Sequence, residues 1–163
     1  IATPLSADEA LARMEGFCAY RERCPQEVRR KMAELGLEGE TAEQIWQVLV
    51  GDGYVNEERF AVAFAGGKFR VNQWGRVRIR LELQQRAIGP DLVRQALDAI
   101  DEVEYLTVLQ ALMEKRYKQY RSAPNARAKT AASLIRAGFE PELVFQRLPR
   151  SGADRQSASD DVV

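Results

Sequence analysis

The side chains most able to do chemistry in this chain are cations, and they gather in two stretches. Residues 66–90 contain six lysine and arginine residues against the single acid Glu82. Residues 110–139 contain seven against the single acid Glu114. Because the formal net charge is zero, the charge is segregated along the chain. Segregated positive charge favours an anionic partner, and ordinary solvated helix faces are the alternative interpretation.

Enzymatic machinery is not indicated by any motif. The sequence has no histidine, which removes the commonest general base, the histidine-activated nucleophiles and most transition-metal sites. Gly66-Gly67-Lys68 lacks the upstream glycine and the hydroxyl residue of a phosphate-binding loop. Cys18 and Cys24 fit neither a CxxC nor a zinc pattern, so we expect free thiols. We therefore expect no enzyme, no catalytic residue, no cofactor and no metal.

The elements that position these cations are indicated by an apolar pattern of fixed period. Two positions recur at intervals of 51 residues, the first at Met32, Leu83 and Leu134, and the second at Leu37, Ile88 and Phe139. Such a period is typical of stacked supersecondary units. Helical spacing runs nearly throughout, without useful β-alternation. The sequence predicts an all-α fold, an elongated, curved array of three tandem three-helix repeats, at residues 5–53, 54–101 and 102–148.

Local signals mark where several helices begin. Ser6 and Asn56 are placed as N-caps, Pro25 suits the first turn of a helix, and Thr41 can cap another. Residues 149–163 are mostly small and polar, without periodicity, and are expected to form a disordered tail. No apolar run is long enough to span a membrane and no signal peptide is visible. With the two cysteines read as reduced thiols, we expect a cytoplasmic protein.

The most specific motif lies within residues 53–93. In order, it consists of Gly53-Tyr54-Val55-Asn56, Arg59-Phe60-Ala61, a basic helix end at Lys68 to Arg70, Gly75, Arg78-Ile79, Glu82-Leu83 and Ile88. This combination resembles the RecX family, the regulatory proteins that modulate the RecA recombinase. The resemblance covers roughly residues 5–148. The chain departs from the family at Arg76, where a proline is frequent, and at Ala87, where a glycine is frequent.

Several motif residues have a purely structural explanation. Ile79 and Leu83 are four apart and form a core stripe, while Glu82 and Arg86 suit a helical ion pair of about 0.3–0.5 kcal/mol. Arg76 and Arg80 are also four apart and are not explained by a core, so we expect both to face a partner. Trp74 flanks the basic stretch, and burial in the core is the favoured interpretation for it.

The resemblance implies a monomeric regulator that binds RecA nucleoprotein filaments on single-stranded DNA. It would lie in the filament groove and inhibit strand exchange and ATP turnover, with only weak, non-specific binding to single-stranded DNA itself. The alternative is a helical DNA-binding protein that acts without RecA through a groove helix at residues 76–86. Either function predicts a RecA-binding or DNA-binding face formed by Lys68, Arg70, Arg76, Arg78, Arg80, Lys115, Arg116, Lys118, Arg121, Arg127 and Lys129.

Overall fold

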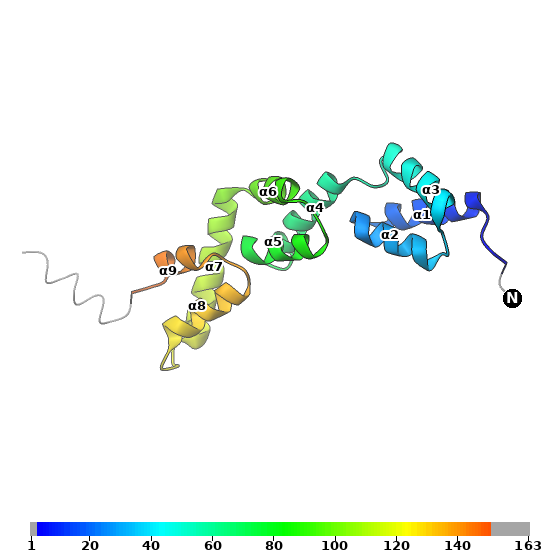
Figure 1. Ribbon diagram of the computed structural model, residues 1–163. Coiled ribbons are helices and arrows are strands. Elements are labelled where there is room, and N and C mark those ends of the chain that lie inside the picture. Colours follow the sequence, from blue (N-terminus) through cyan, green and yellow to red (C-terminus); the bar gives the residue numbers. More distant parts are fainter. Residues whose placement is uncertain (1–2, 151–163) are drawn as a thin grey trace, which may run out of the picture. The chain divides into compact units, whose positions relative to one another are not determined.

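The computed structural model describes residues 3–150, and within them it contains helices and no strand (Figure 1). The helices are α1 (Ala7–Tyr20), α2 (Pro25–Glu34), α3 (Gly39–Gly51), α4 (Glu57–Arg70), α5 (Arg76–Gln85), α6 (Pro90–Asp98), α7 (Glu102–Tyr120), α8 (Ala126–Arg136) and α9 (Pro141–Arg147). The predicted all-α fold is confirmed. Most of the predicted tail, from residue 151 onward, lies outside the described residues. In that described part, no helix combines the length and apolarity needed to cross a membrane.

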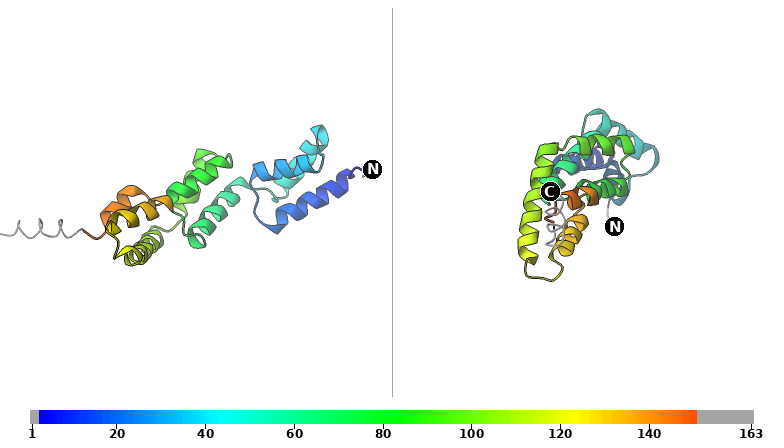
Figure 2. Two further views of the ribbon diagram at one scale, coloured as in Figure 1. Left: turned by 90° about the horizontal axis from the view of Figure 1, so that it is seen from below. Right: turned by 90° about the vertical axis from the view of Figure 1, so that its left-hand side faces the viewer.

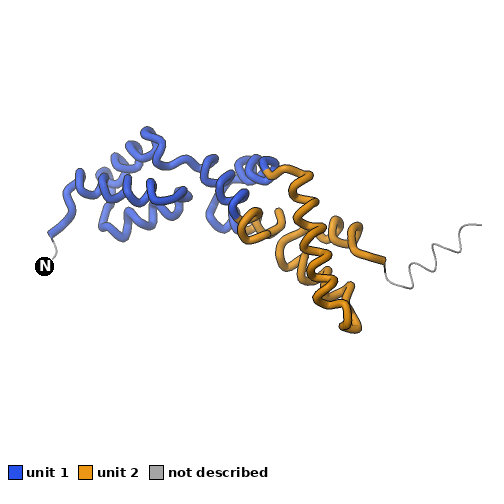
Figure 3. Tube along the Cα trace, turned by 180° about the vertical axis from the view of Figure 1, so that it is seen from behind, with its two compact units in different colours: residues 1–67, 82–99 blue, residues 68–81, 100–163 orange. Residues whose placement is uncertain are grey.

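The described residues divide into two compact units (Figure 3). Unit 1 contains residues 3–67 and 82–99, and unit 2 contains residues 68–81 and 100–150. The division falls inside α4 and α5, so it differs from the three repeats that the periodicity predicts. The repeat boundaries at residues 53 and 101 stay a prediction.

Unit 1 is built around the packing of α1 against α2 and α3. Ala10, Met14 and Cys18 follow one another at intervals of four residues, so they share one face of α1, and all three are buried. Val28 of α2 and Ile45 of α3 belong to the same cluster. The register of apolar residues in the sequence therefore determines which helix faces meet.

Unit 2 is built around three aromatic rings in contact, each tilted with respect to the next. Tyr105 of α7 lies with its ring centroid 5.5 Å from that of Phe69 and 5.4 Å from that of Phe139. All three side chains are buried. α7 and α8 run side by side, and α8 also packs on α9 (Figures 1 and 2). This core holds the last turn of α4 and the start of α5, which carry most of the first cationic stretch.

The 51-residue period corresponds to a turn that the chain makes three times. At the ends of α2, α5 and α8 a backbone N–H donates to the carbonyl five residues earlier, from Leu37 to Met32 at 3.0 Å, from Ile88 to Leu83 at 3.1 Å and from Phe139 to Leu134 at 3.1 Å. This bond defines the Schellman type of helix end, which places the preceding residue in the left-handed region. That residue is Gly36 (φ 76°), Ala87 (φ 58°) and Gly138 (φ 103°).

Most of the predicted helix starts are confirmed, and one is wrong. The side chains of Ser6 and Asn56 accept hydrogen bonds from the backbone three residues later, at 3.2 and 2.8 Å. Pro25 occupies the first turn of α2. Thr41 does not cap α3, because that helix begins two residues earlier, at Gly39. Glycine is a poor helix former, so the local pattern placed the start too late.

Both cysteines are free and buried in unit 1. Burial raises the pKa of the Cys18 and Cys24 thiols above the ordinary value, because the charged thiolate loses solvation. A raised pKa keeps these thiols neutral and unreactive at neutral pH. Both cysteines therefore serve the packing around α1 and the start of α2.

Candidate functional site

Arg76 is the most constrained cation of the predicted face. Its Nε and Nη2 atoms donate to Glu140 Oε2 at 3.0 and 2.5 Å, and its Nη1 donates to Glu102 Oε2 at 2.7 Å. The guanidinium lies 3.9 Å from the centroid of the Tyr105 ring. Its side chain is only 22% exposed. Two carboxylates from the same unit already neutralise Arg76, so the expected contact with a partner stays a prediction that this geometry does not support.

The protonation states around Arg76 follow from this network. Burial of the guanidinium opposes its charge, yet the hydrogen bonds to Glu140 and Glu102 raise the pKa of Arg76 above its ordinary value. Burial, together with a hydrogen bond donated to Glu140, raises the pKa of the Tyr105 hydroxyl. Arg76 is therefore charged and Tyr105 neutral throughout the physiological range.

Backbone contacts at the start of α5 explain why Arg76 lies beside Glu102 and Glu140. The N–H groups of Gly75 and Val77 donate to the carbonyls of Ala137 and Gly138, both at 2.9 Å, and that of Arg76 donates to the Tyr105 hydroxyl at 3.1 Å. The free N–H groups at the start of α5 are thus satisfied by the two residues that follow α8 and by Tyr105 of α7. A Cβ atom at Gly75 would overlap the backbone of Gly138. This part of the family-like motif serves packing.

Two further arginines of the first stretch have acidic partners. Arg70 Nε lies 3.6 Å from Glu104 Oε1, with the arginine side chain 62% exposed. Arg86 Nη1 lies 2.8 Å from Glu82 Oε2, which confirms the ion pair expected from their spacing. Exposed pairs contribute little free energy, so Arg70 can exchange Glu104 for another anion at small cost.

Trp74 is half-buried, so the expectation of a core tryptophan is wrong. The Arg78 guanidinium lies 4.0 Å from the centroid of its indole ring, and Lys68 Nζ lies 4.9 Å from it. We call Lys68, Trp74 and Arg78 the Trp74 patch. Arg80 is exposed further along α5. Neither Arg78 nor Arg80 has an acidic partner among residues 3–150, so both keep their charge available for a ligand.

The second cationic stretch lies at the other end of α7 and at the start of α8. We call it the α7-end patch; it consists of Lys115, Arg116, Lys118, Arg121, Arg127 and Lys129. In the described part of the chain none of these six forms an ion pair. Arg116 donates to the Gln119 side chain at 3.4 Å, and Arg127 Nε donates to the Pro149 carbonyl at 3.2 Å. The positive charge of this patch is therefore not neutralised within unit 2.

The two patches lie apart within unit 2. Arg76 and Arg70 contact Glu102 and Glu104 in the first turn of α7. Lys118 is 16 residues further along the same straight helix, which corresponds to about 24 Å at 1.5 Å per residue. The single face expected from the sequence is thus divided between the two ends of α7.

Sequence reasoning missed the residues that organise both patches. Glu140 reaches Arg76 across 64 positions of the chain, a pairing that no local pattern indicates. Tyr105 stands among apolar residues at helical spacing, a pattern that indicates only a core position. Tyr117 and Pro149, which line a pocket beside the α7-end patch, gave no signal beyond the aromatic position of Tyr117 between Arg116 and Lys118.

The fold and its surfaces define a helical-repeat protein with cationic patches. Two family models match the chain: the second three-helix domain of RecX at residues 56–97 and the third at residues 102–148. Together they cover more than half of the sequence. The chain belongs to the RecX family of regulatory proteins.

Individual relatives support this assignment. Regulatory protein RecX of Prosthecochloris aestuarii is 28% identical over 140 residues, which cover 86% of this chain and 91% of that protein. Regulatory protein RecX of Halorhodospira halophila is 30% identical over 127 residues, with 77% and 78% covered. Regulatory protein RecX of Geobacillus kaustophilus is 27% identical over 139 residues, with 83% and 51% covered, so the chain spans about half of its length.

Solved structures share the fold. The crystal structure of RecX from Lactobacillus salivarius matches with a TM-score of 0.77 at 20% identity, covering 86% of this chain and 93% of that one. A second crystal structure, of regulatory protein RecX, matches with a TM-score of 0.76 at 22% identity, covering 86% and 71%. At such identities the likeness establishes the arrangement of helices alone.

Proposed function

We propose that this chain is a non-enzymatic regulator that binds RecA filaments on single-stranded DNA and inhibits their ATPase and strand-exchange activities. The observation that carries the proposal is its membership of the RecX family. It acts in the cytoplasm, as a monomer and without a cofactor. Its partners are the RecA nucleoprotein filament and, more weakly, single-stranded DNA.

The charges of unit 2 support this proposal. Eight of the eleven cations of the predicted face have no acidic partner in residues 3–150, namely Arg78, Arg80, Lys115, Arg116, Lys118, Arg121, Arg127 and Lys129. Cations without an acidic partner in the same chain suit phosphates or acidic protein surfaces. DNA binding that rests on phosphates should weaken on a log–log salt plot by about 0.7 per phosphate contact on a single strand, with little sequence preference.

The alternative function, DNA binding independent of RecA through a groove helix, has weaker support. A groove helix would use α5, where four arginines were candidates for base contacts. Arg76 is paired with Glu102 and Glu140, and Arg86 with Glu82. Only Arg78 and Arg80 remain, and Arg78 stacks on Trp74. Two exposed arginines do not make a regular base-reading surface.

A RecA ATPase titration at saturating single-stranded DNA tests the proposal. A filament-binding regulator inhibits whether or not DNA is in excess, whereas a DNA competitor loses its effect as DNA is added. The proposal fails if excess DNA abolishes inhibition, or if no inhibition occurs at any concentration.

Charge-reversal variants test whether the α7-end patch contacts the RecA filament. Lys118→Glu combined with Arg121→Glu should weaken inhibition. Arg13→Glu combined with Arg30→Glu changes the net charge equally, at exposed positions of unit 1, and serves as the matched control. Equal inhibition by both double variants would remove the α7-end patch from the proposed interface.

A further inference from the structure

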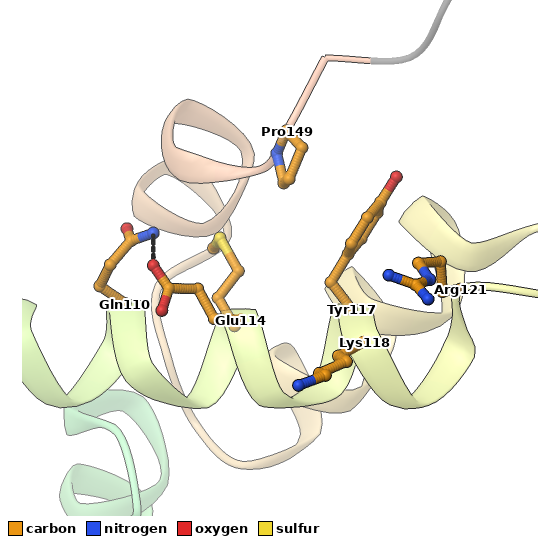
Figure 4. A pocket seen from close by; sticks show the side chains of 7 residues that line it. Gln110, Glu114, Tyr117, Lys118, Arg121 and Pro149 are labelled. Carbon is orange, nitrogen blue, oxygen red and sulfur yellow. Dashed lines mark hydrogen bonds between the residues drawn. The ribbon is translucent and has the colours of Figure 1, made fainter.

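A pocket of about 250 Å³ lies beside the last turns of α7 (Figure 4). Its lining includes Tyr117, Lys118 and Arg121 of the α7 end and Pro149, which follows α9. The Tyr117 ring rises from α7 towards the segment that carries Pro149, with the Arg121 side chain beside it. Pockets that bind drug-sized ligands measure roughly 300–1,000 Å³, so this smaller pocket suits a single small ring system.

The wall opposite Tyr117 is held in place by the rest of unit 2. Arg127 Nε donates to the carbonyl of Pro149 at 3.2 Å, and the neighbouring Leu148 is buried. Arg127, predicted as a contact to the partner, thus uses its Nε to position the pocket. A wall fixed before binding lowers the entropic cost of holding a ligand.

The lining combines an apolar interior with a polar side. Met113 lines the pocket and is almost fully buried, so the inner end is apolar. Gln110 Nε2 donates to Glu114 Oε1 at 3.3 Å, and these two side chains line the other side (Figure 4). Their amide and carboxylate groups offer both donors and acceptors to the edge of a flat ring.

We propose that this pocket receives one unstacked base of single-stranded DNA. Tyr117 stacks on the base, Lys118 and Arg121 bind the neighbouring phosphates, and Pro149 covers the opposite side. Aromatic side chains next to cations are the usual means of binding single strands without sequence preference. The inference rests on the single-stranded DNA binding of the proposed function and adds the residue that takes a base.

The charge around the pocket favours a nucleotide over an apolar protein side chain. Residues 110–139 carry seven cations and only one acid, Glu114, which is already hydrogen-bonded to Gln110. A partner that inserted only an apolar group would leave this positive charge without a counterpart. A strand of DNA supplies a flat ring and two flanking anions together.

The affinity for a short labelled oligonucleotide tests the proposal, measured by fluorescence anisotropy at one low salt concentration. Tyr117→Ala should weaken binding by about 5- to 150-fold, which is the usual effect of losing one base–aromatic stack. Tyr117→Phe keeps the ring and should bind as the unsubstituted protein does. Tyr20→Ala, which removes an exposed tyrosine of unit 1, is the matched control and should not change affinity. Melting curves of all variants separate lost contacts from lost folding.

A photochemical cross-link gives an independent measurement. An oligonucleotide that contains 5-iodocytosine should cross-link to Tyr117, located by mass spectrometry of the digested complex. Unchanged affinity of Tyr117→Ala, or a cross-link confined to residues outside the pocket, would overturn the proposal. If Tyr117→Ala keeps its DNA affinity but loses filament binding, the pocket takes a protein side chain and the base proposal is wrong.

The RecA ATPase assay keeps this inference separate from the proposed function. A protein that cross-links through Tyr117 but never inhibits RecA would refute the regulatory proposal and still support the base pocket. A protein that inhibits RecA but shows no dependence on Tyr117 would refute the base pocket alone.

Discussion

Ile88 donates its backbone N–H to the carbonyl of Leu83 at 3.1 Å and so closes a turn in which Ala87 has a φ of 58°. The equivalent turns at the ends of α2 and α8 have glycine at this position, Gly36 and Gly138. A Cβ atom in the left-handed region costs roughly 1–2 kcal/mol. The middle turn therefore carries strain that the other two avoid.

Ala87→Gly should raise the free energy of unfolding by about 0.5–1 kcal/mol. Removing the Cβ relieves the strain, and the greater freedom of glycine in the unfolded chain offsets part of the gain. Urea denaturation measures the change. The control is Ala63→Gly, at an exposed site inside α4, which should lose up to about 1 kcal/mol. A less stable Ala87→Gly variant would show that the turn is not strained.

Gly75→Ala should destabilise unit 2 by about 1–3 kcal/mol, because the new methyl group would overlap the backbone of Gly138 and Phe139. Backbone atoms cannot turn aside as a flexible side chain does. Gly67→Ala makes the same chemical change inside α4, where a Cβ would meet nothing within 4 Å. It should be neutral or stabilising by up to about 1 kcal/mol. Thermal melting of the two variants compares them directly, and equal melting temperatures would contradict the close approach.

Arg76→Ala should cost about 2–3 kcal/mol, because it leaves Glu140 partly buried without its charged partner. Arg80→Ala removes an exposed arginine of the same helix that has no acidic partner in the described structure, so it should stay within about 0.5 kcal/mol. In the ATPase assay, Arg80 is the residue that should affect inhibition without affecting stability. Comparable losses of stability for the two variants would mean that the Arg76 network contributes little.

Glu27 should make part of the stability of unit 1 sensitive to acid. Burial opposes its charge, but hydrogen bonds from Arg21 and from the Cys24 backbone lower the pKa of the Glu27 carboxyl below its ordinary value. A lowered pKa in the folded state means that the stabilisation is complete above the unfolded pKa of about 4.3. It is lost as the pH falls through the folded pKa.

The variant Glu27→Gln isolates this contribution. Its cost in the free energy of unfolding should be larger at neutral pH than near pH 3, because pH 3 lies below the unfolded pKa and part of the stabilisation by the carboxylate is already lost there. Urea denaturation at both pH values provides the comparison. A cost that is the same at both would show that the carboxylate charge of Glu27 does not contribute.

Local features of this molecule could be predicted from the sequence because their causes are local. Helical periodicity and the capping side chains of Ser6 and Asn56 act within one turn of chain. The ion pair between Glu82 and Arg86 spans a single helical turn. The 51-residue period is visible in the sequence because the chain repeats one turn, in which α2, α5 and α8 each end with the same hydrogen bond.

The tertiary structure alone decided which cations face outward. Arg76, Arg78 and Arg80 look equivalent in the sequence, but packing brings Glu140 to Arg76 from 64 positions away and places Trp74 against Arg78. The length of α7 then separates the two cationic stretches. The pocket beside Tyr117 likewise exists only because packing returns Pro149 to the end of α7. Such contacts depend on how distant segments pack, so the physical reason lies in the core of unit 2 and not in any local pattern.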